Sequence, residues 1–284
     1  LVQMLQIAEA AGAQDQAAGS SDLIHTIAMA WRIADRSIAT HLGDPDYVEV
    51  PVQQLTDADR NAELAASISA DSLAAPLLVA PQVQAVDSTP IVDAPAPDPS
   101  ARAEAGNTTH LTVVDDEGGM VSMTNTITNF FGSGLYSQGF FLNDQLRRFS
   151  IGGQNNAAEA GRRSVSWSLP AIVTDQQGRA VLGLGSPGGR RIPIMLAQVL
   201  VGWGLHGQSL EDVVTAPRFH LEGDELFVER FPTDDVVQQL RQRGYAGPTI
   251  PDPPLYFGSV QALAIDHDTG EVIGARDDRR EADL

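Results

Sequence analysis

The chain has 284 residues, 43% of them hydrophobic, so it can bury a substantial core in one large or two small domains. Its net charge is −19 and all 18 basic residues are arginine, which disfavours nucleic-acid binding because a phosphate backbone would be repelled. The absence of cysteine excludes disulfides, thiolate metal sites and cysteine catalysis.

No stretch approaches the roughly eighteen uninterrupted apolar residues that predict a membrane helix. The first residues, LVQMLQIAEA, lack the basic start and the cleavage site of a signal peptide. Because the first residue is not Met, whether sequence precedes it stays open.

Residues 1 to about 73 show the apolar periodicity of helices. Ser20 is expected to cap a helix that ends at Gly43, and Thr56 to open a variant capping box before the next helix. From about 74 to 107 the chain is rich in proline and alanine, which predicts a flexible linker. We therefore expect a helical part, 1–107, followed by a second part, 108–284.

The second part has the alternation and turn residues of strands, with helices between them. Ser209 and Thr233 are expected to cap helices, and Gly244 to end the second of them. Helices that precede hairpin-linked strands predict an α+β layered sandwich with antiparallel sheets. The expected hairpins and strands are 110–127, 169–185, 219–229 and 260–275, with a buried helix at 192–204.

The run Asn107-Thr108-Thr109-His110 lies where the linker ends and the first predicted strand begins. A threonine hydroxyl needs a base to act as a nucleophile, and cleavage before Thr108 would supply one as its own α-amine. Thr108 is the first candidate for catalysis.

The segment Gly183-Leu184-Gly185-Ser186-Pro187-Gly188-Gly189 follows a strand and precedes a helix. It matches a dinucleotide-binding motif only in outline, because Pro187 removes an amide and no acidic residue follows at the expected distance. Two alternatives remain for Gly188 and Gly189: backbone donors to an oxyanion, or a tight turn in which glycine is needed for steric reasons.

The six histidines stand singly, with no metal-binding motif, so we predict neither a metal nor another cofactor. Arg147 and Arg148, and likewise Arg162 and Arg163, could clamp an anion through their guanidinium groups. For Arg162 the sequence favours a solvated position on the surface of an acidic protein.

Taken in order, these segments resemble the γ-glutamyltranspeptidase family of N-terminal nucleophile hydrolases. The resemblance rests on LGDPDYVEVP, NTTHLTVVDDEG, FFGSG, FFLNDQLRRFS, LGSPGGRRI, APRFH and DDRREADL. It implies a four-layer αββα sandwich and a precursor cut between Asn107 and Thr108 into large and small subunits. Residues 1–107 would be the last part of the large subunit.

The resemblance also implies site residues. Thr108 would be both the processing residue and the catalytic nucleophile, Thr126 would bond its hydroxyl, and Gly188 and Gly189 would form the oxyanion hole. Its α-amine, with an ordinary pKa near 7.7 to 8.0, would act as general base. The family habit is a periplasmic or secreted location, with the cytoplasm left open.

The positions that match the family's substrate-binding residues are Thr128, Gln145, Arg148, Ser166 and Trp167. At these positions only Gln145 and Ser166 are the residue types that the family has. Arg148 replaces a carboxylate that would pair with the substrate ammonium, and an inward guanidinium would suit an acyl group ending in a carboxylate, such as glutaryl. Trp167 replaces a serine and predicts a drier pocket. The alternative for Arg148 is a side chain turned to solvent.

We therefore expect an amidohydrolase or acyltransferase that acts on γ-glutamyl or related amides such as glutathione, with water or an amine as acceptor. Two alternatives stay open. One is an amidase like the glutaryl and cephalosporin acylases, and the other is a self-cleaving but catalytically silent paralogue.

Overall fold

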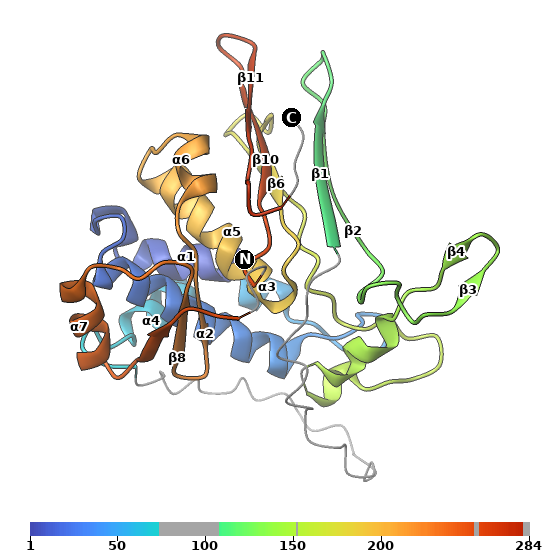
Figure 1. The fold of residues 1–284 in the computed structure, drawn as a ribbon, viewed down its shortest axis with the longest axis horizontal. Helices are drawn as coiled ribbons and strands as arrows, with labels where there is room; N and C mark the ends of the chain where they lie inside the picture. Colours follow the sequence, from blue (N-terminus) through green and yellow to red (C-terminus); the bar gives the residue numbers. More distant parts are fainter. Residues whose placement is uncertain (74–107, 152, 253–255, 281–284) are drawn as a thin grey trace.

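The computed structural model describes residues 1–73, 108–151, 153–252 and 256–280, and its first part is helical, as predicted (Figure 1). Ser20 caps the longest helix, with its Oγ accepting from the Leu23 N–H at 3.2 Å. The helices of this part are α1 (Val2–Ala10), a 3₁₀ turn (Ala13–Asp15), α2 (Ser21–His41), α3 (Val52–Leu55) and α4 (Ala58–Ala66).

The second part alternates strands and helices. Its strands are β1 (Thr108–Val114), β2 (Met120–Thr126), β3 (Tyr136–Ser137), β4 (Phe140–Phe141), β5 (Ala171–Thr174), β6 (Ala180–Gly185), β7 (Phe219–Glu222), β8 (Glu225–Val228), β9 (Ala246–Thr249), β10 (Gln261–Asp266) and β11 (Glu271–Ala275). Its helices are α5 (Ile192–Leu200), continued by a π-helical turn (Val201–Leu205), α6 (Leu210–Thr215) and α7 (Asp234–Gln242), with 3₁₀ helices at Gln145–Ser150, Gln154–Asn156 and Gly189–Arg191.

This part of the molecule has three layers, and the middle one is a sheet with the strand order β11-β10-β6-β5. The antiparallel hairpin β1–β2 packs on one face of this sheet, and α5 and α6 cover the other face (Figure 1). The α+β class predicted from the sequence is confirmed.

One hydrophobic core joins the two parts of the chain. The apolar face of α2 lies against α5 and β7, and the indole N–H of Trp31 donates to the Leu221 carbonyl at 2.9 Å. Because α2 and α5 share this core, the first 73 residues help to hold the helix that follows the glycine loop.

Two sequence expectations about local structure were wrong. Asp57, not Thr56, caps α4, because its carboxylate accepts from the Arg60 N–H at 2.8 Å. The small sheet β7-β8-β9 is not wholly antiparallel, because β8 and β9 pair in parallel after the crossover through α7. The predicted linker, about 74–107, lies outside the described residues.

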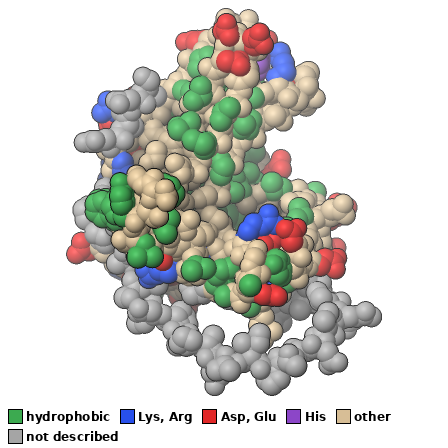
Figure 2. Space-filling view, turned by 90° about the vertical axis from the view of Figure 1, so that its right-hand side faces the viewer, with side chains coloured by type: hydrophobic (Ala, Val, Ile, Leu, Met, Phe, Trp, Pro, Cys, Tyr) green, Lys and Arg blue, Asp and Glu red, His purple; other side chains and the backbone are tan. Residues whose placement is uncertain are grey.

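The two faces of the hairpin β1–β2 differ in polarity. The face toward the central sheet carries hydroxyls and one imidazole, with Val114 and Met120 at the turn end, whereas the outward apolar side chains are exposed. Figure 2 looks onto this side of the molecule and shows hydrophobic side chains gathered there. The exposed apolar residues of the hairpin are Leu111, Val113, Val121 and Met123.

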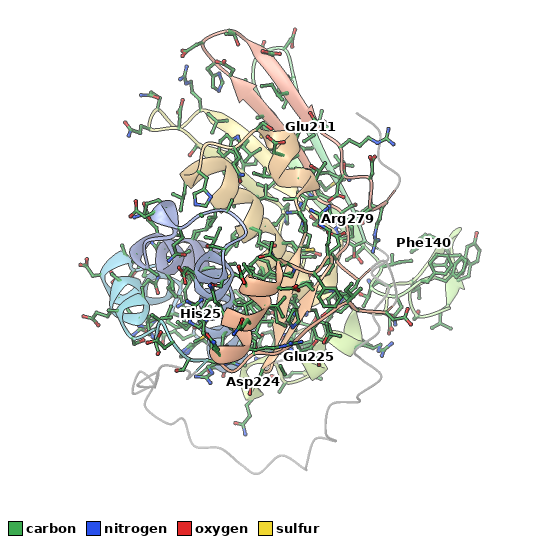
Figure 3. All side chains as sticks on the ribbon, turned by 60° about the vertical axis from the view of Figure 1, so that its left-hand side comes forward. His25, Phe140, Glu211, Asp224, Glu225 and Arg279 are labelled. Carbon is green, nitrogen blue, oxygen red and sulfur yellow. The ribbon has the colours of Figure 1, made fainter. Side chains whose placement is uncertain are left out.

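A second hairpin, β3–β4, projects from the body and carries Phe140 near its end (Figure 3). Phe131, Tyr136 and Phe141 form ring contacts along it, with centroids 5.0 to 5.1 Å apart. This hairpin connects the positions predicted at Thr128 and Gln145.

Candidate active site

Thr108 is the first residue of β1 and lies opposite Thr126, the last residue of β2. The alternation of the strand turns both side chains toward the central sheet, where the Thr108 Oγ1 donates to the Thr126 Oγ1 at 2.9 Å. The predicted pair of hydroxyls is therefore formed. Asn107, the other predicted processing residue, lies outside the described residues.

Thr128 extends this pair into a chain of polar groups. Its backbone N–H donates to the Thr126 Oγ1 at 3.0 Å, and its own Oγ1 donates to the Gln145 Oε1 at 3.1 Å. The Gln145 Nε2 in turn donates to the Ser164 Oγ at 3.0 Å. Sequence reasoning missed Ser164, because nothing in its spacing distinguishes it from the serines that follow it.

The backbone at Thr128 is strained. Its φ is 78°, in the left-handed region that a β-branched residue rarely adopts. Such strain persists only where surrounding contacts hold it, and here those contacts are the bonds to Thr126 and Gln145. These bonds hold Thr128 next to Thr126, the hydrogen-bond partner of Thr108.

The glycine loop begins where β6 ends. The Ser186 Oγ lies within hydrogen-bond distance of the carbonyl oxygens of Pro187 (2.6 Å) and Ser259 (2.9 Å), which ties the loop to the segment that leads into β10. Gly188 has φ 137°, and a Cβ there would lie 2.7 Å from the Met195 Cε. Within the described residues, neither Gly188 nor Gly189 donates its N–H to a hydrogen bond. Both amides are available to an anion.

The hairpin and β6 are aligned residue by residue across the two β layers. A Cβ built on Gly183 would lie 2.6 Å from the Thr112 Cγ2, and one on Gly185 would lie 2.3 Å from the His110 ring. The two strands therefore approach closely. They run in opposite directions, because the later residue of β6 lies opposite the earlier residue of β1.

This alignment places Thr108 next to the glycine loop. Continued past Gly185, the last residue of β6, the same alignment would bring Thr108 toward Pro187, directly before Gly188. An oxyanion hole requires backbone amides at such a position, and the role of Gly188 and Gly189 stays a prediction.

Arg148 lies on the 3₁₀ helix Gln145–Ser150, three residues after Gln145. Residues at this spacing share a face of a 3₁₀ helix, so both side chains lie on the same side. Arg148 is 8% exposed, and its carbonyl accepts from the Asn156 Nδ2 at 2.7 Å. The solvent-facing alternative for Arg148 was wrong.

Ser166 and Trp167 are not drawn into the chain of hydroxyls by any described contact. Ser166 is exposed, and its Oγ accepts from the Ser168 N–H at 3.1 Å. Trp167 belongs to the hydrophobic core, with its ring centroid 6.3 Å from that of Trp31. Their predicted contact with substrate stays a prediction.

Arg162 and Arg163 have different surroundings. The side chain of Arg162 is only 6% exposed and its guanidinium lies over the Tyr47 ring, so the predicted solvated position was wrong. Arg163 bonds Asp44 through its backbone N–H and its guanidinium, and these bonds hold the pKa of that carboxyl well below its usual range. Both contacts connect the segment after α2 to the second part of the chain.

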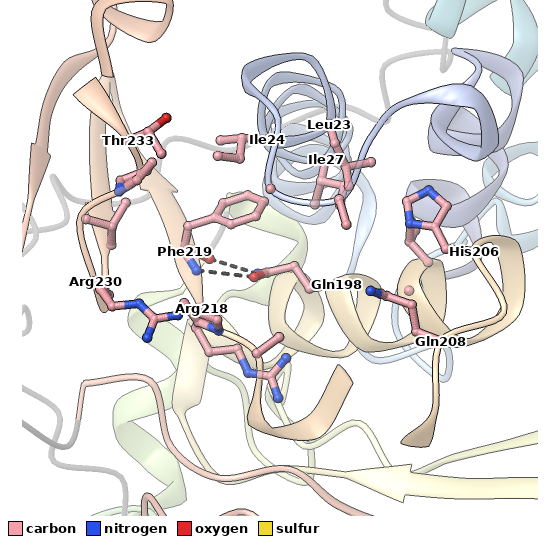
Figure 4. A pocket seen from close by; sticks show the side chains of 18 of the residues that line it. Leu23, Ile24, Ile27, Gln198, His206, Gln208, Arg218, Phe219, Arg230 and Thr233 are labelled. Carbon is pink, nitrogen blue, oxygen red and sulfur yellow. Dashed lines mark hydrogen bonds between the residues drawn. The ribbon is translucent and has the colours of Figure 1, made fainter. Parts of the chain in front are cut away.

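A cavity of about 500 Å³ lies away from this site, between the start of α2, the π-helical turn and the segment before β7 (Figure 4). Leu23, Ile27 and Phe219 give it apolar walls, and the Gln198 side chain is bonded to the Phe219 backbone. None of its lining residues belongs to the Thr108 network. In the described part of the chain no group of three metal-ligating side chains occurs, and no helix is long and apolar enough to cross a membrane.

The family model for gamma-glutamyltranspeptidase matches residues 1–284. The chain belongs to this family. It is 31% identical to the capsule biosynthesis protein CapD proenzyme of Bacillus anthracis, over 99% of this chain and 47% of that protein. It is 32% identical to the glutathione hydrolase proenzyme of Escherichia coli (strain K12), over 100% of this chain and 48% of that protein.

Acylases of the family are similar to a comparable degree. The acylase ACY 1 proenzyme of Pseudomonas sp. (strain V22) is 31% identical, over 97% of this chain and 45% of that protein. The crystal structure of cephalosporin acylase from Bacillus halodurans shares the fold, with a TM-score of 0.75 and 22% identity over 98% of this chain and 48% of that chain. The chain thus spans about half the length of the curated relatives it matches.

Proposed function

We propose that this protein is a self-cleaving amide hydrolase or acyltransferase with Thr108 as its N-terminal nucleophile. The observation that carries the proposal is the Thr108–Thr126 hydroxyl bond at 2.9 Å. The glycine loop supports it, because in the described residues the N–H groups of Gly188 and Gly189 make no hydrogen bond. Membership of a family whose relatives are named proenzymes supports it.

Cleavage would begin with attack of the Thr108 Oγ on the carbonyl of residue 107, which shifts the acyl group from nitrogen to oxygen. The shift breaks the C–N bond between residues 107 and 108 and frees the α-amine of Thr108. Water then hydrolyses the ester, which frees the Thr108 hydroxyl and leaves a carboxylate on residue 107. That amine has an ordinary pKa near neutrality, so it can take the hydroxyl proton when Thr108 attacks a substrate amide.

The substrate reaction would use the same groups. The N–H groups of Gly188 and Gly189 would stabilise the oxyanion, and the proton held by the α-amine would pass to the departing amine. An acyl ester on Thr108 remains, and water or an amine resolves it.

The acyl group is the open part of the proposal. Gln145 and Thr128 form one polar patch beside the nucleophile, and the buried Arg148 shares the helix face of Gln145. A guanidinium that faced the acyl group would repel a substrate ammonium and attract a carboxylate. These observations favour a glutaryl-like acyl group over a γ-glutamyl group that keeps its free α-amine.

The test is intact mass spectrometry of the complete polypeptide before and after incubation with γ-glutamyl-anilide and with glutaryl-anilide. We expect two polypeptides that separate before Thr108, a mass increase on the Thr108 piece, and faster cleavage of the glutaryl compound. Thr108→Ala should leave one uncut polypeptide.

The outcomes separate the alternatives. If the parent protein is not cut before Thr108, the proposal that Thr108 is an N-terminal nucleophile is wrong. A cut parent that neither compound acylates supports the silent paralogue, and faster turnover of γ-glutamyl-anilide removes the glutaryl preference while keeping the mechanism. The periplasmic or secreted location also stays a proposal, to be tested by cell fractionation.

A further inference from the structure

His110 is a buried polar residue beside the site for which the proposed reaction has no use. It lies two residues after Thr108, on the same inward face of β1, and is 5% exposed. Its Nδ1 lies 2.8 Å from the Thr124 Oγ1, and its Nε2 lies 3.1 Å from the Thr112 Oγ1 and 3.4 Å from the Ser122 Oγ. Three hydroxyls of the hairpin thus surround one imidazole.

The hydrogen-bond partners determine which ring nitrogen carries the proton. The Ser122 hydroxyl has one proton and donates it to the Leu184 carbonyl at 3.2 Å, so toward His110 it can only accept. This contact favours the tautomer with the proton on Nε2, from which the Thr112 hydroxyl can also accept, and the Nδ1 then accepts from the Thr124 hydroxyl. Burial lowers the pKa of His110 to about 4, which keeps the ring neutral near neutral pH.

The same ring fills the space between the nucleophile hairpin and β6. A Cβ on Gly185 would lie 2.3 Å from both the Cε1 and the Nδ1 of His110, so only glycine allows this approach. Gly185 is the last residue of β6 and precedes Gly188 by three positions. The imidazole therefore sets how closely the start of the glycine loop approaches the strand that carries Thr108.

We infer that His110 is a positioning residue, which as a neutral Nε2–H imidazole bonded to Thr124 and stacked on Gly185 sets the distance from Thr108 to the glycine loop. The inference rests on the proposed function of Thr108. Its contribution would be geometric, since displacing a reacting group by about 1 Å can cost about 100-fold in rate. His110 itself takes no proton during the reaction.

The kinetic test is a double-mutant cycle between His110 and Gly185. Gly185→Ala alone should lower kcat by about 100-fold and leave KM within about twofold, because its Cβ meets the ring and moves the loop. His110→Ala removes the three ring atoms that lie nearest to the added Cβ, so the double variant should be no slower than His110→Ala alone. Gly204→Ala is the matched control, because a Cβ there meets no atom within 4 Å.

A measurement on the parent protein does not depend on activity. Long-range ¹H–¹⁵N NMR correlations of the His110 ring should show a protonated Nε2 and an unprotonated Nδ1 at pH 7. The opposite tautomer, or losses that simply multiply in the double variant, would overturn the inference even if the parent is cleaved and active. A parent that is not cut at Thr108 instead overturns the proposed function.

Discussion

The nucleophile hairpin and the glycine loop meet at one site but are positioned by different means. In the hairpin β1–β2, side-chain hydroxyls and one imidazole make the contacts, from the Thr108–Thr126 bond to the His110–Thr124 bond. In the loop before α5, the backbone itself lies against its neighbours, and a Cβ at Gly185 or Gly188 would come within 2.7 Å of another side chain. The hairpin should therefore tolerate substitutions that keep a hydroxyl, whereas the loop should tolerate no added atom.

The largest effect expected is that of Gly188→Ala. Its φ of 137° is strained for alanine, and relief of that strain would turn the amide away from the oxyanion. Loss of one such donor lowers kcat by about 10²- to 10³-fold with little change in KM. Steady-state kinetics with an anilide substrate measure this, with the melting temperature as a check on folding. Unchanged turnover would show that this amide does not face the reacting carbonyl.

The second effect concerns the stability of the hairpin in acid. In the folded protein the pKa of His110 is about 4, below its ordinary value of 6.5. The unfolded chain therefore binds a proton between these values that the folded chain does not, so His110 lowers the free energy of unfolding as the pH falls from 6.5 to 4. The full loss is roughly 3 kcal/mol, from 1.36 kcal/mol for each unit of the shift.

This acid dependence is measured by urea unfolding of the parent and of His110→Asn at pH 7 and pH 4.5. The parent should lose more stability between the two pH values than the variant, because the other histidines are common to both. Equal losses would mean that His110 is not held neutral in the folded state.

Much of the hairpin could be predicted from the sequence because its signals are local. The alternation in residues 110–127 and the acidic, glycine-containing turn within them predict two antiparallel strands, and β1 and β2 form there. Ser20 and Ser209 cap helices as predicted, since a cap bond spans only three residues.

The surroundings of the site could not be predicted in this way because they depend on contacts between distant segments. The position of Trp167 is set by Trp31 on α2, and the burial of Arg148 by the segment around Asn156. Spacing along the chain carries no signal for either contact. The family resemblance identified which positions matter, but not which way their side chains turn.

A third prediction tests the hydroxyls of the hairpin directly. Thr126→Val keeps the shape of the side chain but removes the partner of the Thr108 hydroxyl and of the Thr128 N–H. Loss of a hydrogen bond of roughly 1.5 kcal/mol predicts a kcat about tenfold lower. Thr126→Ser keeps the oxygen and should stay within about twofold of the parent. If serine and valine are equally slow, the hydroxyl bond is not what matters at this position.

The smallest effect should come from the outward face of the same hairpin. Val113 is 53% exposed and Val121 is 58% exposed, so replacing either with threonine, which has the same shape and strand preference, exchanges one solvated group for another. The free energy of unfolding should change by no more than about 0.5 kcal/mol. Val199→Thr on α5 is the matched control, because Val199 is 0% exposed and a buried hydroxyl without a partner costs about 1 to 3 kcal/mol. Urea unfolding of the parent and the three variants measures these free energies. If Val113→Thr costs as much as Val199→Thr, then the outward face of the hairpin is buried in the complete protein, and the apparent contrast between its two faces reflects a contact with another layer rather than with water.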